Sequence, residues 1–178
     1  GEITDADGLK HWLDDVLTAG SGRSDALILS LVHREILPDG ALASLAAALA
    51  PSRERWDETL AQGSAFVSTT NALLGTDIAP AALPVVVGIQ ARSLELATEV
   101  VIALYLHGFA GNLVAVATRA VPLGQTAGQG VLDRLAPRIT ALARTLADAT
   151  PEDFASAVPR ADIAAMAHET AEVRLFRS

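Results

Sequence analysis

The chain has 178 residues, a net charge of −8, 51% hydrophobic residues and only 4% aromatic residues. Its length is suited to a single domain, which we expect to span residues 1–178. The negative charge argues against a surface that binds nucleic acid, and the lack of cysteine excludes disulfides and thiolate metal sites. No basic stretch followed by an apolar core opens the chain, so we predict no secretory signal.

Apolar residues recur with helical periodicity along the chain, and the alternating pattern typical of strands is absent. We therefore predict an all-α protein, a compact bundle of about seven to nine helices. The expected helices end at capping residues, glycines and prolines, and Gly20-Ser21-Gly22 and Pro38-Asp39-Gly40 are read as breaks. Their approximate bounds are 5–19, 24–36, an Ala-rich helix between Gly40 and Pro51, 52–74, 84–92, 96–120, 126–149, 151–157 and 162–170. Gly63 is interpreted as a close approach inside its helix, and Pro137 should kink or divide the helix 126–149.

The helix expected at about 96–120 carries no charged residue from Val100 to Thr118. That length is enough to cross a bilayer, but His107 and Asn112 lie in its middle and no basic flank or aromatic belt borders it. We interpret it as the buried apolar helix at the centre of the bundle and predict no membrane contact, with a membrane helix as the alternative. His107 is then expected to be a core histidine satisfied by one hydrogen bond. A metal contact at a dimer axis, where two copies of the chain converge, is the alternative for this side chain.

The Gly-rich segment from Gly124 to Gly130 invites a nucleotide-binding interpretation. It lacks the Gly-Lys-Ser/Thr ending of a P-loop, and Lys10 is the only lysine of the chain, so we predict close helix packing instead. Gln125 and Gln129 lie four residues apart on one helical face, near Arg119. A solvated polar face is the simplest interpretation of these three side chains.

Two further polar patterns favour structural roles. The four histidines are scattered, so no metal site is predicted within the chain. The cluster from Arg53 to Glu58 is expected to be a solvated helix face, with Trp56 packing inward.

The C-terminus is unusual because Leu175 and Phe176 stand between Arg174 and Arg177. Burial would stabilise each apolar side chain by roughly 1.5–3 kcal/mol. We therefore expect both to dock against the protein's own body or against a partner.

Two motifs resemble signatures of the urease accessory protein family UreF. The ending from His168-Glu169-Thr170 to Arg174-Leu-Phe-Arg-Ser178 is similar to that family's C-terminus, and Arg119-Ala-Val-Pro-Leu-Gly-Gln125-Thr-Ala-Gly-Gln129 is similar to its central signature. The two motifs occur in the family's order and at about its spacing. Weaker similarity extends through Gln62-Gly63 and Pro84–Gly88.

The resemblance implies a cytoplasmic, all-α accessory protein without catalytic activity that acts in urease maturation. In this family the protein forms a homodimer within a complex with UreD (UreH in some species), which recruits the GTPase UreG and delivers nickel to apo-urease. GTP, magnesium and most nickel ligation would belong to UreG, so no cofactor is expected on this chain. Residues 162–178 would form a partner-docking tail. The implied partner-binding residues are Arg119, Gln125, Gln129, His168, Glu169, Arg174, Leu175, Phe176 and Arg177.

The chain also departs from the family pattern. It starts at Gly1-Glu-Ile-Thr4, so we expect the family's N-terminal apolar segment to be missing, and we assign no GTPase contact that depends on it. Ala167 and Ala171-Glu172-Val173 stand where the family tends to have Arg and Gln-Tyr-Ser, which would weaken tail docking. Outside the family, the alternatives are a helical scaffold for unrelated partners and a helical enzyme that binds a small molecule.

Overall fold

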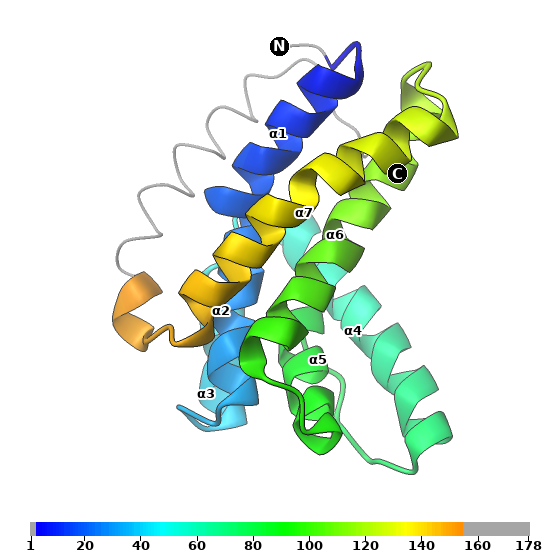
Figure 1. Ribbon diagram of the computed structural model, residues 1–178. Coiled ribbons are helices and arrows are strands. Elements are labelled where there is room, and N and C mark those ends of the chain that lie inside the picture. Colours follow the sequence, from blue (N-terminus) through cyan, green and yellow to red (C-terminus); the bar gives the residue numbers. More distant parts are fainter. Residues whose placement is uncertain (1–2, 155–178) are drawn as a thin grey trace.

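A computed structural model describes residues 3–154, and this part of the chain contains helices and no strands (Figure 1). The predicted all-α class is therefore confirmed. The α-helices are α1 Ala6–Thr18, α2 Ser21–His33, α3 Asp39–Ala48, α4 Arg53–Leu74, α5 Leu83–Ala91, α6 Thr98–Ala120 and α7 Gln125–Ala147, with 3-10 helices η1 Arg92–Leu94 and η2 Pro151–Phe154. The helix expected at 162–170 lies outside the described residues, so the total number of helices stays a prediction.

Local capping explains where several helices begin and end. The Asp5 side chain accepts hydrogen bonds from the first turn of α1, and Ser52 caps α4 in the same way. Gly75 ends α4 in the left-handed conformation, with φ of 68°. The predicted start of the second helix at 24 was wrong. Helix α2 begins at Ser21, because Gly20 has the extended conformation of a residue that precedes a helix. Only Ala19 and Gly20 therefore separate α1 from α2.

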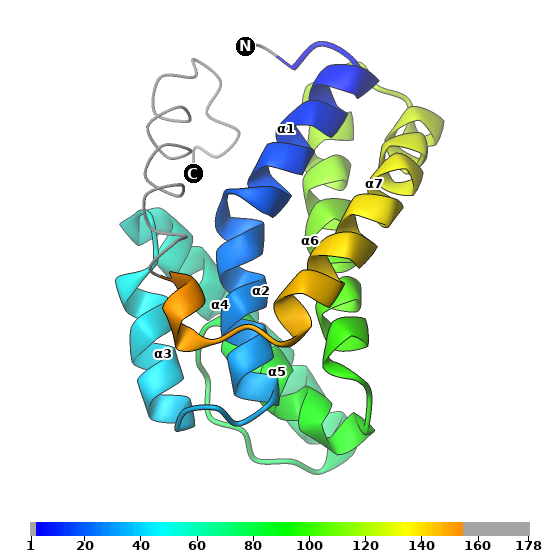
Figure 2. The ribbon, with the colours of Figure 1, turned by 60° about the vertical axis from the view of Figure 1, so that its left-hand side comes forward.

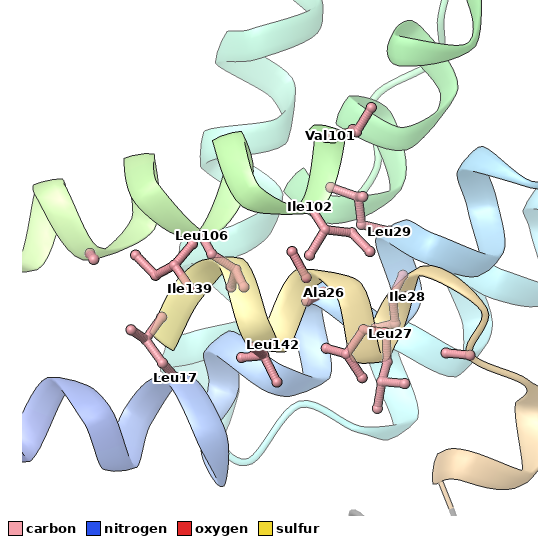
Figure 3. Packing of buried hydrophobic residues seen from close by; sticks show 14 of the residues in the cluster. Leu17, Ala26, Leu27, Ile28, Leu29, Val101, Ile102, Leu106, Ile139 and Leu142 are labelled. Atoms are coloured by element: carbon pink, nitrogen blue, oxygen red, sulfur yellow. The ribbon is translucent and has the colours of Figure 1, made fainter. Parts of the chain in front are cut away.

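Helix α2 occupies the centre of the fold. Figure 2 shows it between α1, α6 and α7 on one side and the α3–α5 region on the other. Its residues from Asp25 to Val32 are all buried. In Figure 3 its apolar side chains meet Leu17 of α1, Ile102 and Leu106 of α6, and Ile139 and Leu142 of α7.

Helix α6 was predicted to be buried on all sides at the centre, and this was wrong. It buries one face, with Ile102, Leu106 and Ala110 against α2 and α7, whereas Leu104 is 62% exposed. Only 33% of its most apolar window is buried, although its mean hydropathy of 1.9 and its length would allow it to cross a bilayer. Length and hydropathy do not separate a membrane helix from a packed one, so the absence of membrane contact stays a prediction.

We expected Pro137 to kink or divide this helix. Helix α7 continues through Pro137, so the division was wrong, and the kink stays a prediction. Pro137 removes the hydrogen bond to the carbonyl of Asp133, but both residues are exposed and water can solvate that carbonyl. Two arginines join α7 to α1: Arg134 bonds Asp7 at 2.6 Å and Arg138 bonds Asp14 at 2.9 Å. These exposed ion pairs connect α7 to α1 on both sides of the proline.

Candidate partner-binding site

The residues of the central motif gather where α6 meets α7 (Figure 1). Arg119 lies in the last turn of α6, Gln125 begins α7, and Gln129 follows one turn later. All three side chains are exposed. We refer to Arg119, Gln125 and Gln129 together as the α6–α7 corner.

The connection between the two helices is tightly built. The Val121 N–H donates to the Ala117 carbonyl at 2.8 Å, and the Leu123 N–H donates to the Val121 carbonyl at 2.6 Å. Leu123 packs against the core, which anchors the middle of the connection. The sequence therefore turns within four residues and begins α7 with Gln125 facing solvent.

Gly128 allows the two helices to approach closely just beyond the corner. A Cβ atom at this position would lie 2.8 Å from Thr118 Cγ2 and 2.9 Å from Val114 Cγ1. The predicted role of glycine in close packing is therefore confirmed at Gly128. It was wrong for Gly130, where an added Cβ would meet no atom within 4 Å.

The side chains of the corner have no hydrogen-bond or ion-pair partner among residues 3–154. By contrast, Arg134 and Arg138 of α7 each form an ion pair with a carboxylate of α1. In the described part of the chain, nothing occupies the donors and acceptors of the three corner side chains. They form the polar surface that the sequence pattern predicted, held by a rigid helix junction.

The predicted tail residues lie outside the described part of the chain. His168, Glu169, Arg174, Leu175, Phe176 and Arg177 are therefore not placed relative to the corner, and the tail 162–178 stays a prediction. Within residues 3–154, no group of three or more His, Asp or Glu side chains is arranged to hold a metal ion.

A buried polar network between α2, α4 and α6 was missed by the sequence analysis. The guanidinium of Arg55 donates to Asp25 Oδ2 at 2.7 Å, and the Tyr105 hydroxyl donates to the same oxygen at 2.8 Å. Arg55 also pairs with Glu58 at 3.3 Å and lies 5.9 Å from the ring centre of Phe109. The prediction that the Arg53–Glu58 cluster is a solvated face was thus wrong for Arg55, whose side chain is only 18% exposed.

Burial sets the protonation of this network. It raises the pKa of Asp25, against the opposing effect of the Arg55 charge, and it raises the pKa of Tyr105 well above its usual value. One sequence signal was available: Asp25 directly precedes the apolar run from Ala26 to Leu29, where an acidic residue needs a partner.

A mainly apolar groove of about 400 Å³ lies between α4, α5 and α6, and Arg55 and Tyr105 form part of its wall. A second groove of about 310 Å³ lies between α6 and α7 and includes His107.

His107 is exposed, so the prediction that it is a core histidine was wrong. It lies on the side of α6 that faces away from the core.

Comparison with known proteins assigns the family. The family model described as UreF matches residues 3–136, which include the whole α6–α7 corner. The chain belongs to the UreF family. Proteins named urease accessory protein UreF from Cereibacter sphaeroides and Dinoroseobacter shibae are 49% identical over 178 residues and 48% identical over 180 residues, respectively. A relative of the same name from Paracoccus denitrificans is 43% identical over 178 residues. Each alignment covers 100% of this chain, and 84%, 84% and 82% of the three relatives in that order.

Membership in the UreF family confirms the resemblance drawn from the two motifs. The match also extends far beyond them, through all of α1 to α6 and the first half of α7.

Proposed function

We propose that this UreF-family chain is a non-catalytic accessory protein of urease maturation. It bridges UreD (UreH) and the GTPase UreG so that nickel is inserted into apo-urease. Family membership and the names of its relatives support this role. The chain acts in the cytoplasm as a homodimer within that complex, and the partners handle nickel, GTP and magnesium.

The observation that carries the proposal is the exposed α6–α7 corner. One guanidinium and two carboxamides stand without partners among residues 3–154, on a junction that Gly128 and Leu123 hold rigidly. Arg119, Gln125 and Gln129 would form directional hydrogen bonds to a partner there. The backbone that carries them would not need to rearrange, because the helix junction already fixes it. The tail from Arg174 to Arg177 would supply the apolar part of the same recognition.

The test is capture of partners by a variant with Arg119→Ala, Gln125→Ala and Gln129→Ala. We expect the co-purified amounts of UreD and UreG, and the urease activity of cells that express the urease genes, to fall at least about tenfold. Far-ultraviolet circular dichroism should be unchanged, because all three side chains are exposed. Deleting residues 174–178 should also abolish capture of UreD.

Arg53→Ala is the matched control, because Arg53 lies on α4 and its side chain is 90% exposed. This variant should capture both partners like the unmodified chain. Full capture by the triple variant, or GTP hydrolysis by the purified chain above background, would overturn the proposal.

A further inference from the structure

One close contact holds the end of α6 against the start of α7, directly beside the α6–α7 corner. Gly128 of α7 is buried there, and a Cβ at this position would lie 2.8 Å from Thr118 Cγ2 and 2.9 Å from Val114 Cγ1. We call these three residues the α6–α7 spacer. Thr118 directly precedes Arg119, and Gly128 directly precedes Gln129. A change in the separation of the helices at the spacer therefore moves the side chains of the corner.

The side chains that α6 contributes to the spacer cannot move aside easily. The Thr118 hydroxyl donates a hydrogen bond to the Ala115 carbonyl at 3.1 Å, which fixes the rotamer that directs the Cγ2 methyl group toward α7. Val114 is 3% exposed and is also branched at Cβ, so its χ1 angle has one strongly preferred value in a helix. The separation of the two helices is therefore decided by the residue that stands at position 128.

The first turns of α7 have few other contacts that set their position. Gly124 precedes the helix without a side-chain capping hydrogen bond. Leu123 packs against the core and Val131 is fully buried, and in the described segment between them Gly128 is the one buried residue. The ion pairs between α7 and α1 begin only at Arg134. The start of α7 is thus held against α6 at the spacer.

We propose that Thr118 and Gly128 are positioning residues for partner recognition. Their contact sets the distance between Arg119 on α6 and the two glutamines on α7, so that the three corner side chains reach one partner surface together. Hydrogen bonds form over a narrow range of about 2.7–3.2 Å between donor and acceptor. A corner that is too wide satisfies either Arg119 or the glutamines, but not both at once. This inference rests on the proposed function, because it assigns the geometry of the same surface.

The substitution Gly128→Ala tests the spacer directly. Carbon atoms in contact lie about 3.5–4.0 Å apart, so a Cβ placed 2.8 Å from Thr118 Cγ2 must push the helices apart by roughly 0.7 Å or more. We expect the co-purified amounts of UreD and UreG to fall at least about tenfold, while the helical circular dichroism is retained. Gly130→Ala is the matched control, because the same change beside Gln129 meets no atom within 4 Å. This control should capture both partners like the unmodified chain.

Moving the contact from α6 to α7 should restore recognition. Thr118→Ser and Val114→Ala together remove both methyl groups that face Gly128, and the serine keeps a hydroxyl for the Ala115 carbonyl. With Gly128 retained, this double variant leaves the helices without a defined separation, and we expect a smaller loss of capture than with Gly128→Ala. Adding Gly128→Ala to it fills the space again and gives the rescue variant. Capture by the rescue variant should return to within about twofold of the unmodified chain.

The melting temperature separates a positioning role from a merely structural one. Val114→Ala removes buried methyl groups, so the rescue variant should melt below the unmodified chain even though its capture is restored. If the spacer only stabilised the fold, capture would instead follow the melting temperature from one variant to the next. Capture is therefore measured with equal amounts of folded chain, at a temperature well below every melting point.

Normal capture by Gly128→Ala, or capture by the rescue variant that stays reduced, would overturn the proposal. The rescue variant and the double variant decide the question even if Gly128→Ala alone does not fold. The triple alanine variant of the corner separates this inference from the proposed function. If that variant captures UreD and UreG normally, the proposed function is wrong. If it loses both partners while Gly128→Ala keeps them, the proposed function holds and the positioning role is wrong.

Discussion

Tyr105 on α6 and Asp25 on α2 are joined by a 2.8 Å hydrogen bond from the phenol to the carboxylate, and Arg55 of α4 reaches the same oxygen. Three helices that are distant in sequence thus share one carboxylate. A charged group in this position is tolerated only while its partners are present, because the surroundings are apolar.

Replacing Asp25 with alanine should therefore destabilise the fold strongly. The change leaves the Arg55 guanidinium without its main counter-ion in a mostly buried place, and we expect a loss of about 3 kcal/mol in the free energy of unfolding. Urea denaturation followed by circular dichroism measures this loss. Asp133→Ala, at an exposed position of α7, should change the same quantity by less than about 0.5 kcal/mol. Equal effects of the two substitutions would show that the network is not structural.

The raised pKa of Asp25 predicts a pH dependence of stability. The folded state holds the proton of this group more tightly than the unfolded state, whose pKa is near 3.8. The stabilising contribution of protonation is complete below that value and is lost as pH rises through the folded-state pKa. Relative to Asp25→Asn, the free energy of unfolding of the unmodified chain should therefore fall as pH rises from about 4. A constant difference across that range would contradict the prediction.

His33 should show the opposite dependence. Burial, together with the nearby Arg92 and Arg34 charges, lowers its pKa below 6.5 in the folded state, and its Nδ1 lies 3.0 Å from Thr98 Oγ1. The part of the free energy of unfolding that depends on neutral His33 is present above the pKa of this histidine in the unfolded chain. It is lost as pH falls through the lower pKa that His33 has in the folded state. We expect thermal unfolding of His33→Asn to be less sensitive to acid below pH 6.5 than that of the unmodified chain.

Two glycine substitutions should change stability in opposite directions. Gly63→Ala places a Cβ 1.9 Å from the Ala81 carbonyl oxygen, so α4 must move away from the loop before α5, at a cost of about 1–3 kcal/mol or more. Gly130→Ala enters open space on α7 and should stabilise the chain by about 0.4–1 kcal/mol. Thermal melting of both variants checks the pair, and a neutral Gly63→Ala would mean that the crossing of α4 with this loop is loose.

The sequence predicted the local features of the fold well. The cap at Ser52 and the end of α4 before Gly75 follow from chemistry within a few residues. Gly63 marked a close approach by its small size alone, although the Ala81 carbonyl that it meets lies 18 residues away. It failed where tertiary packing decides. From composition we predicted α6 at the centre of the fold, but the structure has α2 there. Five other α-helices pack around α2, whereas one side of α6 is exposed to solvent.

For the candidate site, too, the sequence predicted the local features and missed the tertiary ones. Spacing placed Gln125 and Gln129 on one exposed face of α7, next to Arg119, because that requires only helical geometry. The burial of Arg55 depends on Asp25 and Tyr105, which lie 30 and 50 residues away. No local pattern reports such a convergence.

The enclosed position of α2 also bears on how the molecule comes apart. A helix contacted on every side cannot lose one neighbour without exposing leucines to water, so the helices should melt together in an all-or-none transition. The two tryptophans report on different regions, since Trp12 belongs to α1 and Trp56 to α4, and both pack against the core. Their fluorescence and the helical ellipticity should therefore trace one coincident melting curve.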